Sequence, residues 1–188
     1  MRDQDLVLET REVRLRKVRV TDAPALYELL LNPEVTRFIG IETPESTDEV
    51  HRYLENLQKR WKRSESRAFS LCKLNEKKQD TIAGVISLEE INYRDLKAEL
   101  GIWLGRPFWG TGIAQAGITL ILQVAFLTLA LRRVYARVAV DNERMQNRFE
   151  SFGFEREGIL HQDVEIHNIP TDMILYAILR DKYLDLKK

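Results

Sequence analysis

The sequence predicts a single mixed α/β domain, and three observations lead to this prediction. Strand-like and helix-like segments follow in the order strand, two helices, three strands, helix, strand, helix and two strands. A chain of 188 residues suits one domain, which buries roughly 70% of its unfolded surface on folding. No repeat, low-complexity stretch or linker divides the chain, so we expect one domain over residues 1–188 with its core at about 10–183.

The chain is predicted to begin with a strand followed by a helix. Residues 12–20 partly alternate between apolar and polar side chains, which favours a strand. Thr21 or Asp22 can then cap a helix over about 22–31. We expect this helix to stop before Pro33, because proline disfavours helical geometry in the residue that precedes it.

A second helix and a hairpin are predicted to follow. Ser46 and Glu49 fit a capping box at the start of an amphipathic helix over 47–62. Beyond it the pattern predicts strands at 67–74 and 81–88, joined by a polar turn at 75–80.

The second half is predicted to contain four strands and two helices. The helix that begins after Asp141 or Asn142 should end at Phe152, where Gly153 provides a C-terminal stop. The other helix spans about 113–131, and the strands lie at 98–104, 134–140, 154–160 and 173–179, with a polar loop at 161–172 before the last one.

Composition excludes several classes of protein. Lys and Arg total 29, as do Asp and Glu, so no global basic field recruits nucleic acid. No apolar run approaches the ~20 residues that span a bilayer, and the N-terminus has no signal-like segment, so we expect a cytoplasmic protein without membrane contact. A single cysteine, Cys72, excludes an internal disulfide framework, and His51, His161 and His167 lack the spacing of metal ligands, so no metal is expected.

The most informative motif is the loop between strand 98–104 and helix 113–131. Gly110 and Gly112 allow the backbone to approach an anion, and the start of the helix offers unpaired N–H groups to a phosphate. The alternative interpretation is an ordinary tight turn. A P-loop is excluded because Ile113 and Ala114 follow Gly112 in place of Lys and Ser or Thr. A dinucleotide-binding fingerprint also fails, because Gln115 replaces its third glycine.

Taken with its flanks, this loop resembles that of the GNAT superfamily of acetyltransferases, particularly the RimJ/RimL-type N-terminal acetyltransferases. The family loop reads Gln/Arg-x-x-Gly-x-Gly/Ala, and here Trp109, Gly112 and Ala114 fill its first, fourth and last positions. Four further segments resemble the subgroup in the right order: residues 14–16 with 32–37, 98–104, 141–158 and 172–176.

The resemblance implies a mostly antiparallel, splayed sheet of about seven strands with about four helices, and acetyl-CoA as cosubstrate. It implies that the pantetheine arm lies along the backbone of Ile102, Trp103 and Leu104. Asn142 would hydrogen-bond the cofactor, a role that can coexist with capping a helix. The pyrophosphate would bind the amides of the loop, namely Trp109, Gly110, Thr111, Gly112, Ile113 and Ala114.

Catalytic residues are less well marked. Glu99 is the first candidate for the base that removes a proton from the amine, and a surface carboxylate is the alternative. Asp163 and Glu165 are weaker candidates, and Asp172 can instead orient their loop. Where the resemblance leads us to expect a proton donor, the chain has Met145 and Glu150. Tyr176 is therefore a fallback donor, with core packing as its alternative.

The predicted activity is transfer of an acetyl group to a primary amine, with a protein or peptide N-terminus favoured as acceptor. Alternatives are a small-molecule amine such as a polyamine or aminoglycoside, a CoA-binding module with weak catalysis, and a nucleotide-binding α/β protein. Either a monomer or a homodimer is expected. Four residues are predicted to line the acceptor site: Arg37, Glu89, Glu90 and Tyr93. His161 and His167 are candidates at the mouth of that site, and Cys72 is expected to be a buried packing residue.

Overall fold

The computed structural model describes residues 6–187, and within them eight strands form one sheet. The strand order across the sheet is β1-β2-β3-β4-β5-β6-β8-β7. Every neighbouring pair is antiparallel except β5 and β6, which are parallel, so the predicted mixed, mostly antiparallel sheet is confirmed. The strands are β1 Val7–Glu9, β2 Val13–Lys17, β3 Arg67–Leu74, β4 Asp80–Asn92, β5 Lys97–Leu104, β6 Arg133–Ala139, β7 Glu155–Ile166 and β8 Ile169–Leu179.

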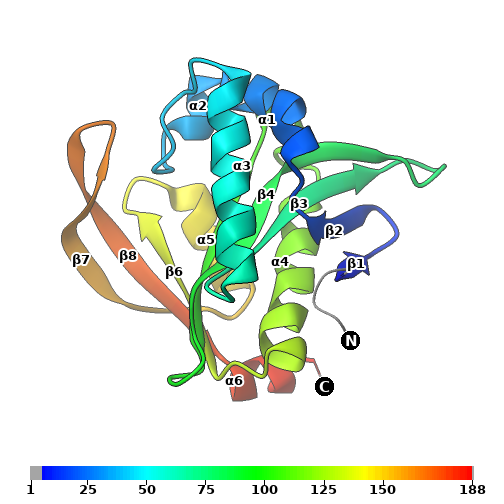
Figure 1. Ribbon diagram of the computed structural model, residues 1–188. Coiled ribbons are helices and arrows are strands. Elements are labelled where there is room, and N and C mark those ends of the chain that lie inside the picture. The colour runs from blue at the N-terminus through cyan, green and yellow to red at the C-terminus, as the bar shows by residue number, and fades with distance from the viewer. Residues whose placement is uncertain (1–5, 188) are drawn as a thin grey trace.

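Six α-helices in the same residues surround this sheet (Figure 1). They are α1 Ala23–Leu30, α2 Pro33–Thr36, α3 Thr47–Lys62, α4 Ile113–Gln123, α5 Glu143–Ser151 and α6 Arg180–Asp185. The elements that the sequence did not predict, β1, α2 and α6, are three, four and six residues long. Segments this short complete too little of a period to stand out in the hydrophobic pattern.

The sheet separates two apolar cores. Val85 and Ile86 are neighbours on β4 and point to opposite faces, as successive strand residues must. Val85 packs with buried residues of α1 and α3, whereas Ile86 packs with buried residues of α4. Gly117 of α4 lies so close to the sheet that an added Cβ would stand 3.0 Å from the Leu71 side chain. The helices therefore cover both faces of the sheet, as a two-sided α/β architecture requires.

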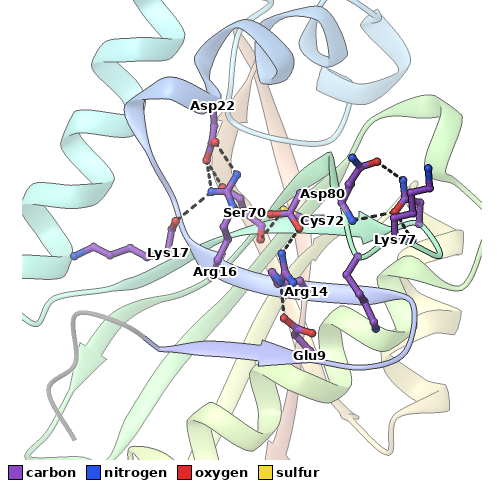
Figure 2. Close-up of polar contacts among 12 residues, drawn as sticks. Glu9, Arg14, Arg16, Lys17, Asp22, Ser70, Cys72, Lys77 and Asp80 are labelled. Atoms are coloured by element: carbon purple, nitrogen blue, oxygen red, sulfur yellow. Dashed lines mark hydrogen bonds and ion pairs between the residues drawn. The ribbon is translucent and has the colours of Figure 1, made fainter.

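Asp22 behaves differently from the predicted helix cap. It occupies the N-cap position of α1 but makes no side-chain cap hydrogen bond there. Its carboxylate instead accepts two hydrogen bonds from the Arg16 guanidinium, both at 2.8 Å, and one from the Ser70 hydroxyl at 2.6 Å (Figure 2). Burial alone would raise the pKa of Asp22, but these hydrogen bonds outweigh it and lower that pKa. The buried network ties the start of α1 to β2 and β3.

The capping box predicted for α3 is also corrected. Ser46 is the N-cap residue but makes no side-chain cap hydrogen bond. The Glu49 carboxylate accepts a hydrogen bond from the backbone N–H of Glu45 at 3.0 Å, one residue before the predicted partner. The helix thus begins where the sequence predicts, although its cap is made by a neighbouring amide.

The predicted polar loop at 161–172 is wrong, because β7 and β8 continue through it as a long hairpin. Only His167 and Asn168 separate the strands, and both have positive φ, 52° and 62°, as in a type I′ turn. The hairpin extends past β6 at the left of Figure 1. Much of β7 is exposed on both faces, so it lacks the alternation that marks a half-buried strand.

Two other predicted boundaries also differ in the structure. The loop expected at about 89–97 is shorter, because β4 continues to Asn92 across a bulge and β5 begins at Lys97. The helix expected to reach residue 131 leaves regular geometry after Gln123 and continues as a π turn over Val124–Thr128. The remaining predicted strands and helices lie close to their predicted ranges.

Candidate active site

The sheet opens between β5 and β6. These parallel strands pair only where Lys97–Glu99 meets Arg133–Tyr135. Beyond that point, β5 pairs only with β4 and β6 pairs only with β8 in the described part of the chain. The two strands therefore diverge, as predicted, and each leaves backbone N–H and C=O groups available along one edge. Ile102, Trp103 and Leu104 lie on the open stretch of β5.

The loop that follows β5 has two glycines in the left-handed region of backbone conformation. Gly110 and Gly112 have φ values of 76° and 84°, a region that L side chains adopt at a cost. Gly112 is the N-cap of α4, so the first amides of that helix, which have no partner within the helix, follow directly after this loop. A Cβ built on either glycine would meet no atom within 4 Å, which leaves open space beside the backbone. A phosphate group fits this arrangement of amides and open space.

Trp109 fixes this loop to the strand. Its indole N–H donates a hydrogen bond to the Leu104 carbonyl at 2.8 Å. Two guanidinium groups lie near its ring: the central carbon of Arg144 is 4.6 Å from the ring centroid and that of Arg106 is 4.8 Å away. Cation–π contacts of this kind hold a guanidinium in place while leaving its edge available.

A cavity of about 400 Å³ lies beside the loop, and we call it the donor cavity because the family resemblance predicts the acetyl donor there. Its walls come from β5, the loop, the start of α5 and the segment around α2. Thr111 and Ile113 do not line it: the Thr111 hydroxyl donates to the Phe108 carbonyl at 2.7 Å, and Ile113 is buried in the core. The other eight predicted cofactor-binding residues do line it, namely Ile102, Trp103, Leu104, Trp109, Gly110, Gly112, Ala114 and Asn142.

A second cavity, of about 460 Å³, lies further along the opening between β5 and β6, and we call it the acceptor cavity. Segments from α3, β4, β5, β6 and the β7–β8 hairpin form its walls. Residues that line both cavities mark where the two meet: Phe38, Ile39, Ile102, Trp103, Asn142 and Met145.

Glu99 lies in the acceptor cavity but is already engaged. Its two carboxylate oxygens accept hydrogen bonds from Arg137 Nε and Nη2, at 2.9 and 2.8 Å. Arg137 also contacts Asp163 Oδ2 at 3.1 Å, and these partners raise the pKa of the guanidinium. Glu99 is the last residue of β5 that pairs with β6, and Arg137 lies two residues beyond its partner Tyr135, so the ion pair bridges the two strands where they begin to diverge.

Glu89 lies opposite Glu99 in the register of β4 and β5, and it also lines the acceptor cavity. Arg60 of α3 lies 2.7 Å from one of its oxygens. Burial raises the pKa of Glu89, and the Arg60 charge reduces this effect without cancelling it. The sequence marks Glu89 only as a lining residue, because neither its burial nor its partner on a distant helix follows from local pattern.

Tyr176 lies elsewhere. It is buried in the core with Phe149 and is not among the residues that line either cavity. Its hydroxyl donates to Glu150 Oε1 at 2.8 Å, and burial together with this hydrogen bond raises the pKa of Tyr176 to about 12. Core packing thus describes its surroundings.

Asn142 caps a helix, as predicted, and also lines a cavity wall. It is the N-cap of α5, and its side-chain oxygen accepts a hydrogen bond from the Met145 N–H at 3.3 Å. It also lines both cavities, as does Met145. Met145 has no proton to donate, so the junction of the cavities lacks the side-chain donor that this position was expected to hold.

The hairpin residues divide into those near the cavity and those that shape the hairpin. Glu165 lines the acceptor cavity. Asp172 accepts hydrogen bonds from the Gln162 N–H and from the His161 ring, both at 2.8 Å, and these contacts join β7 to β8 in place of the loop that Asp172 was expected to orient. His167 connects the hairpin tip to the α2 region: its ring nitrogens lie 3.1 Å from Glu42 Oε2 and 3.0 Å from the Thr36 carbonyl.

The remaining candidates have other surroundings. Arg37 lines the donor cavity and not the acceptor cavity. Glu90 accepts a hydrogen bond from the Tyr135 hydroxyl at 3.0 Å, and Tyr93 lies 3.4 Å from an Arg67 nitrogen; neither lines a cavity. Cys72 is fully buried, as predicted.

Residues 6–187 contain neither a cluster of metal-ligating side chains nor a membrane-spanning helix. No group of three or more His, Cys, Asp or Glu side chains is placed to hold a metal ion in that range. None of its helices combines the length and the apolar character that crossing a membrane demands.

Comparison with known proteins agrees with this geometry. Residues 12–155 match the acetyltransferase (GNAT) domain family. The chain is 26% identical to the uncharacterized N-acetyltransferase YoaA of Bacillus subtilis, over 94% of this chain and 98% of that protein. It is 31% identical to the ribosomal-protein-serine acetyltransferase of Escherichia coli, over 55% of this chain and 58% of that protein.

Solved structures show the same fold. Spermidine N-acetyltransferase from Vibrio cholerae, in complex with CoA and spermine, superposes with a TM-score of 0.80 at 28% identity, covering 93% of this chain and 99% of that one. RimJ from Mycobacterium smegmatis, in complex with CoA-disulfide, gives a TM-score of 0.86 at 21% identity, covering 96% and 90% of the two chains.

Proposed function

The chain belongs to the acetyltransferase (GNAT) family, and from that premise we propose that it moves an acetyl group from acetyl-CoA to the primary amine of a protein or peptide N-terminus. The observation that carries the proposal is the junction of the two cavities at the opening between β5 and β6. A donor on one side and an acceptor on the other can meet there within one ternary complex.

The residues on the donor side suit CoA. Amides at the start of α4 and in the glycine loop bind the pyrophosphate, and the open edge of β5 at Ile102–Leu104 binds the pantetheine arm. Asn142, at the junction, hydrogen-bonds the donor near its thioester. A backbone N–H on the same edge of β5 stabilises the oxygen of the thioester carbonyl as negative charge develops on it.

Acetyl transfer forms a carbon–nitrogen bond and breaks the carbon–sulfur bond. A protonated amine loses one proton before it attacks and a second, which passes to water, as the amide forms. We assign removal of the first of these protons to Glu89, directly or through water, because Glu89 lines the acceptor cavity and burial raises its pKa, which makes its carboxylate a stronger base. Glu99, the candidate from sequence, has both oxygens engaged by Arg137 and becomes a positioning residue that holds the two strands together. The departing thiolate takes its proton from water, since a thiol of ordinary pKa leaves without help from an acid.

The charges of the acceptor cavity favour an acceptor with a single positive charge. Two of its glutamates, Glu89 and Glu99, already face arginines, and only Glu165 has no ion pair within residues 6–187. A polyamine carries several charges and would need several unpaired carboxylates. A peptide N-terminus carries one charge, followed by polar amides. It therefore suits a cavity in which most glutamates are already paired with arginines.

A small polyamine is the second candidate acceptor. It is favoured by the likeness to the Vibrio cholerae spermidine N-acetyltransferase, which extends over nearly the whole of both chains. Glu165 provides one unpaired carboxylate for such a substrate.

The proposal is tested by incubating the protein with acetyl-CoA and a panel of acceptors while free thiol is measured. The panel contains N-terminal peptides that begin with different residues, the same peptides with blocked N-termini, spermidine and an aminoglycoside. We expect thiol release with free peptides and none with blocked ones. Turnover of spermidine alone would replace the peptide acceptor by a polyamine, and no turnover with any amine would overturn the proposal.

A further inference from the structure

Helix α5 presents two arginines to the donor cavity. Arg144 and Arg148 are four residues apart, so they lie on the same side of the helix, and both line the cavity. Arg148 Nη1 lies 3.4 Å from Gln115 Oε1, in the first turn of α4. Arg144 stacks on Trp109, which precedes the glycines. The two arginines thus reach the two ends of the anion-binding loop.

These guanidinium groups are not neutralised within the protein. Neither Arg144 nor Arg148 forms an ion pair with a carboxylate in residues 6–187. Arg106, also stacked on Trp109, differs because it lies 2.7 Å from Glu34 Oε2. Asp141 and Glu143 line the same cavity, so their carboxylates offset the positive charge of the two arginines. What this wall offers to a phosphate is therefore the position of its guanidinium groups and not a net positive charge.

The stack on Trp109 restrains Arg144. The indole is fixed by its hydrogen bond to the Leu104 carbonyl, so the guanidinium is held at one place relative to both β5 and the loop. A restrained guanidinium loses less side-chain entropy on binding than a free one, and its planar edge suits phosphate oxygens.

We infer that Arg144 and Arg148 bind a phosphate group of the CoA donor and set the affinity of the protein for it. The inference rests on the proposed function, because it requires CoA in the donor cavity. It adds a pair of side chains from α5 to the backbone amides of the loop. The phosphate is either the pyrophosphate or the 3′-phosphate, and both offer the same oxygen chemistry.

The experiment is calorimetric titration of the wild-type protein, Arg144→Gln and Arg148→Gln with CoA and with 3′-dephospho-CoA. Arg52→Gln, on the exposed surface of α3, is the matched control. Losing one charge-assisted hydrogen bond corresponds to about a tenfold weaker binding of CoA. Equal loss for both ligands identifies the pyrophosphate, and loss confined to CoA identifies the 3′-phosphate. Either result supports the inference.

Steady-state kinetics separate binding from structural damage. We expect each variant to raise the KM for acetyl-CoA about tenfold while kcat at saturating donor stays within twofold of wild type. Arg144→Lys keeps the charge but loses the planar stack, so its KM should fall between those of wild type and Arg144→Gln. Binding of CoA by both Gln variants within twofold of the Arg52→Gln control would overturn the inference. Failure of the wild-type protein to bind CoA would instead overturn the proposed function.

Discussion

The donor and acceptor cavities are built in different ways. The donor cavity depends on consecutive residues, the end of β5, the glycine loop and the start of α4, and much of its binding capacity comes from the backbone. The acceptor cavity depends on side chains from seven separate helices and strands, with arginines and glutamates paired across them. A backbone site for a constant donor leaves the side chains of the other cavity free to differ with the acceptor.

The largest effect should come from the acceptor side, with Glu89→Gln. Loss of a general base typically costs about a hundredfold or more in kcat. In the wild-type protein kcat/KM should fall as pH drops through the raised pKa of Glu89, because protonation removes the base. The pH profile of the variant should lack this limb.

Glu90→Gln is the matched control for Glu89→Gln, since Glu90 is exposed and lines neither cavity. It should leave kcat unchanged and keep the acidic limb, which should move to slightly lower pH because the charge of Glu90 contributes to the raised pKa of Glu89. If Glu99→Gln lost the acidic limb of the profile and Glu89→Gln kept it, the base would be Glu99, as the sequence alone predicts.

The next largest effect should come from the donor side, with Gly112→Ala. A left-handed φ of 84° costs an alanine about 1–2 kcal/mol, and the added Cβ points into the space assigned to phosphate. We expect the KM for acetyl-CoA to rise about tenfold, with little change in the KM for the acceptor. Gly158→Ala also adds a Cβ in open space, but without positive φ, and should change neither constant. Equal KM values for the two variants would contradict the phosphate assignment.

A smaller effect is expected at the ion pair that bridges β5 and β6, with Arg137→Gln. The variant removes the partner of Glu99, whose side chain is only 14% exposed. We expect the free energy of unfolding, measured by urea denaturation, to fall by about 1 kcal/mol. In the double variant Arg137→Gln/Glu99→Gln the loss should be smaller than the sum of the single losses. Additive losses would mean that the pair does not hold the strands together.

The smallest effect concerns the edge of the acceptor cavity, at His167. Hydrogen bonds to Glu42 and to the Thr36 carbonyl raise the pKa of His167. Only the imidazolium can donate to both oxygens. The docking of the hairpin tip is therefore complete below the ordinary pKa of histidine, about 6.5, and is lost as pH rises through the raised value. Titration of the ring by NMR should show the raised pKa, and Glu42→Gln should bring it down; an unchanged pKa would contradict the contact.

The contrast between the donor and acceptor cavities also explains which parts of the site could be predicted from sequence. The glycine loop, the splay of β5 and β6 and the cap at Asn142 are local or follow from ordered motifs, and the structure has them where they were expected. The partners of Glu89 and Glu99 are not local, because Arg60 and Arg137 lie on distant segments. No periodicity or spacing reports such contacts.

Two errors have the same origin. The segment 161–172 is polar because the hairpin is exposed on both faces, and a polar strand without alternation is indistinguishable from a loop by pattern. Thr21 or Asp22 was expected to cap α1, and Asp22 is indeed the N-cap residue, but its carboxylate bonds the tertiary partner Arg16 and not the helix. In each case tertiary contact decides what local preference leaves open.

The most direct test of the account is a crystal structure of the protein with CoA. We claim that the two cavities are the donor and acceptor halves of one site, and this structure would show whether CoA binds accordingly. We predict the phosphates beside Gly110, Gly112 and the start of α4, and the sulfur at the junction, within contact distance of Asn142 or Met145. Phosphates bound away from the loop, or a sulfur that points away from the acceptor cavity, would contradict it.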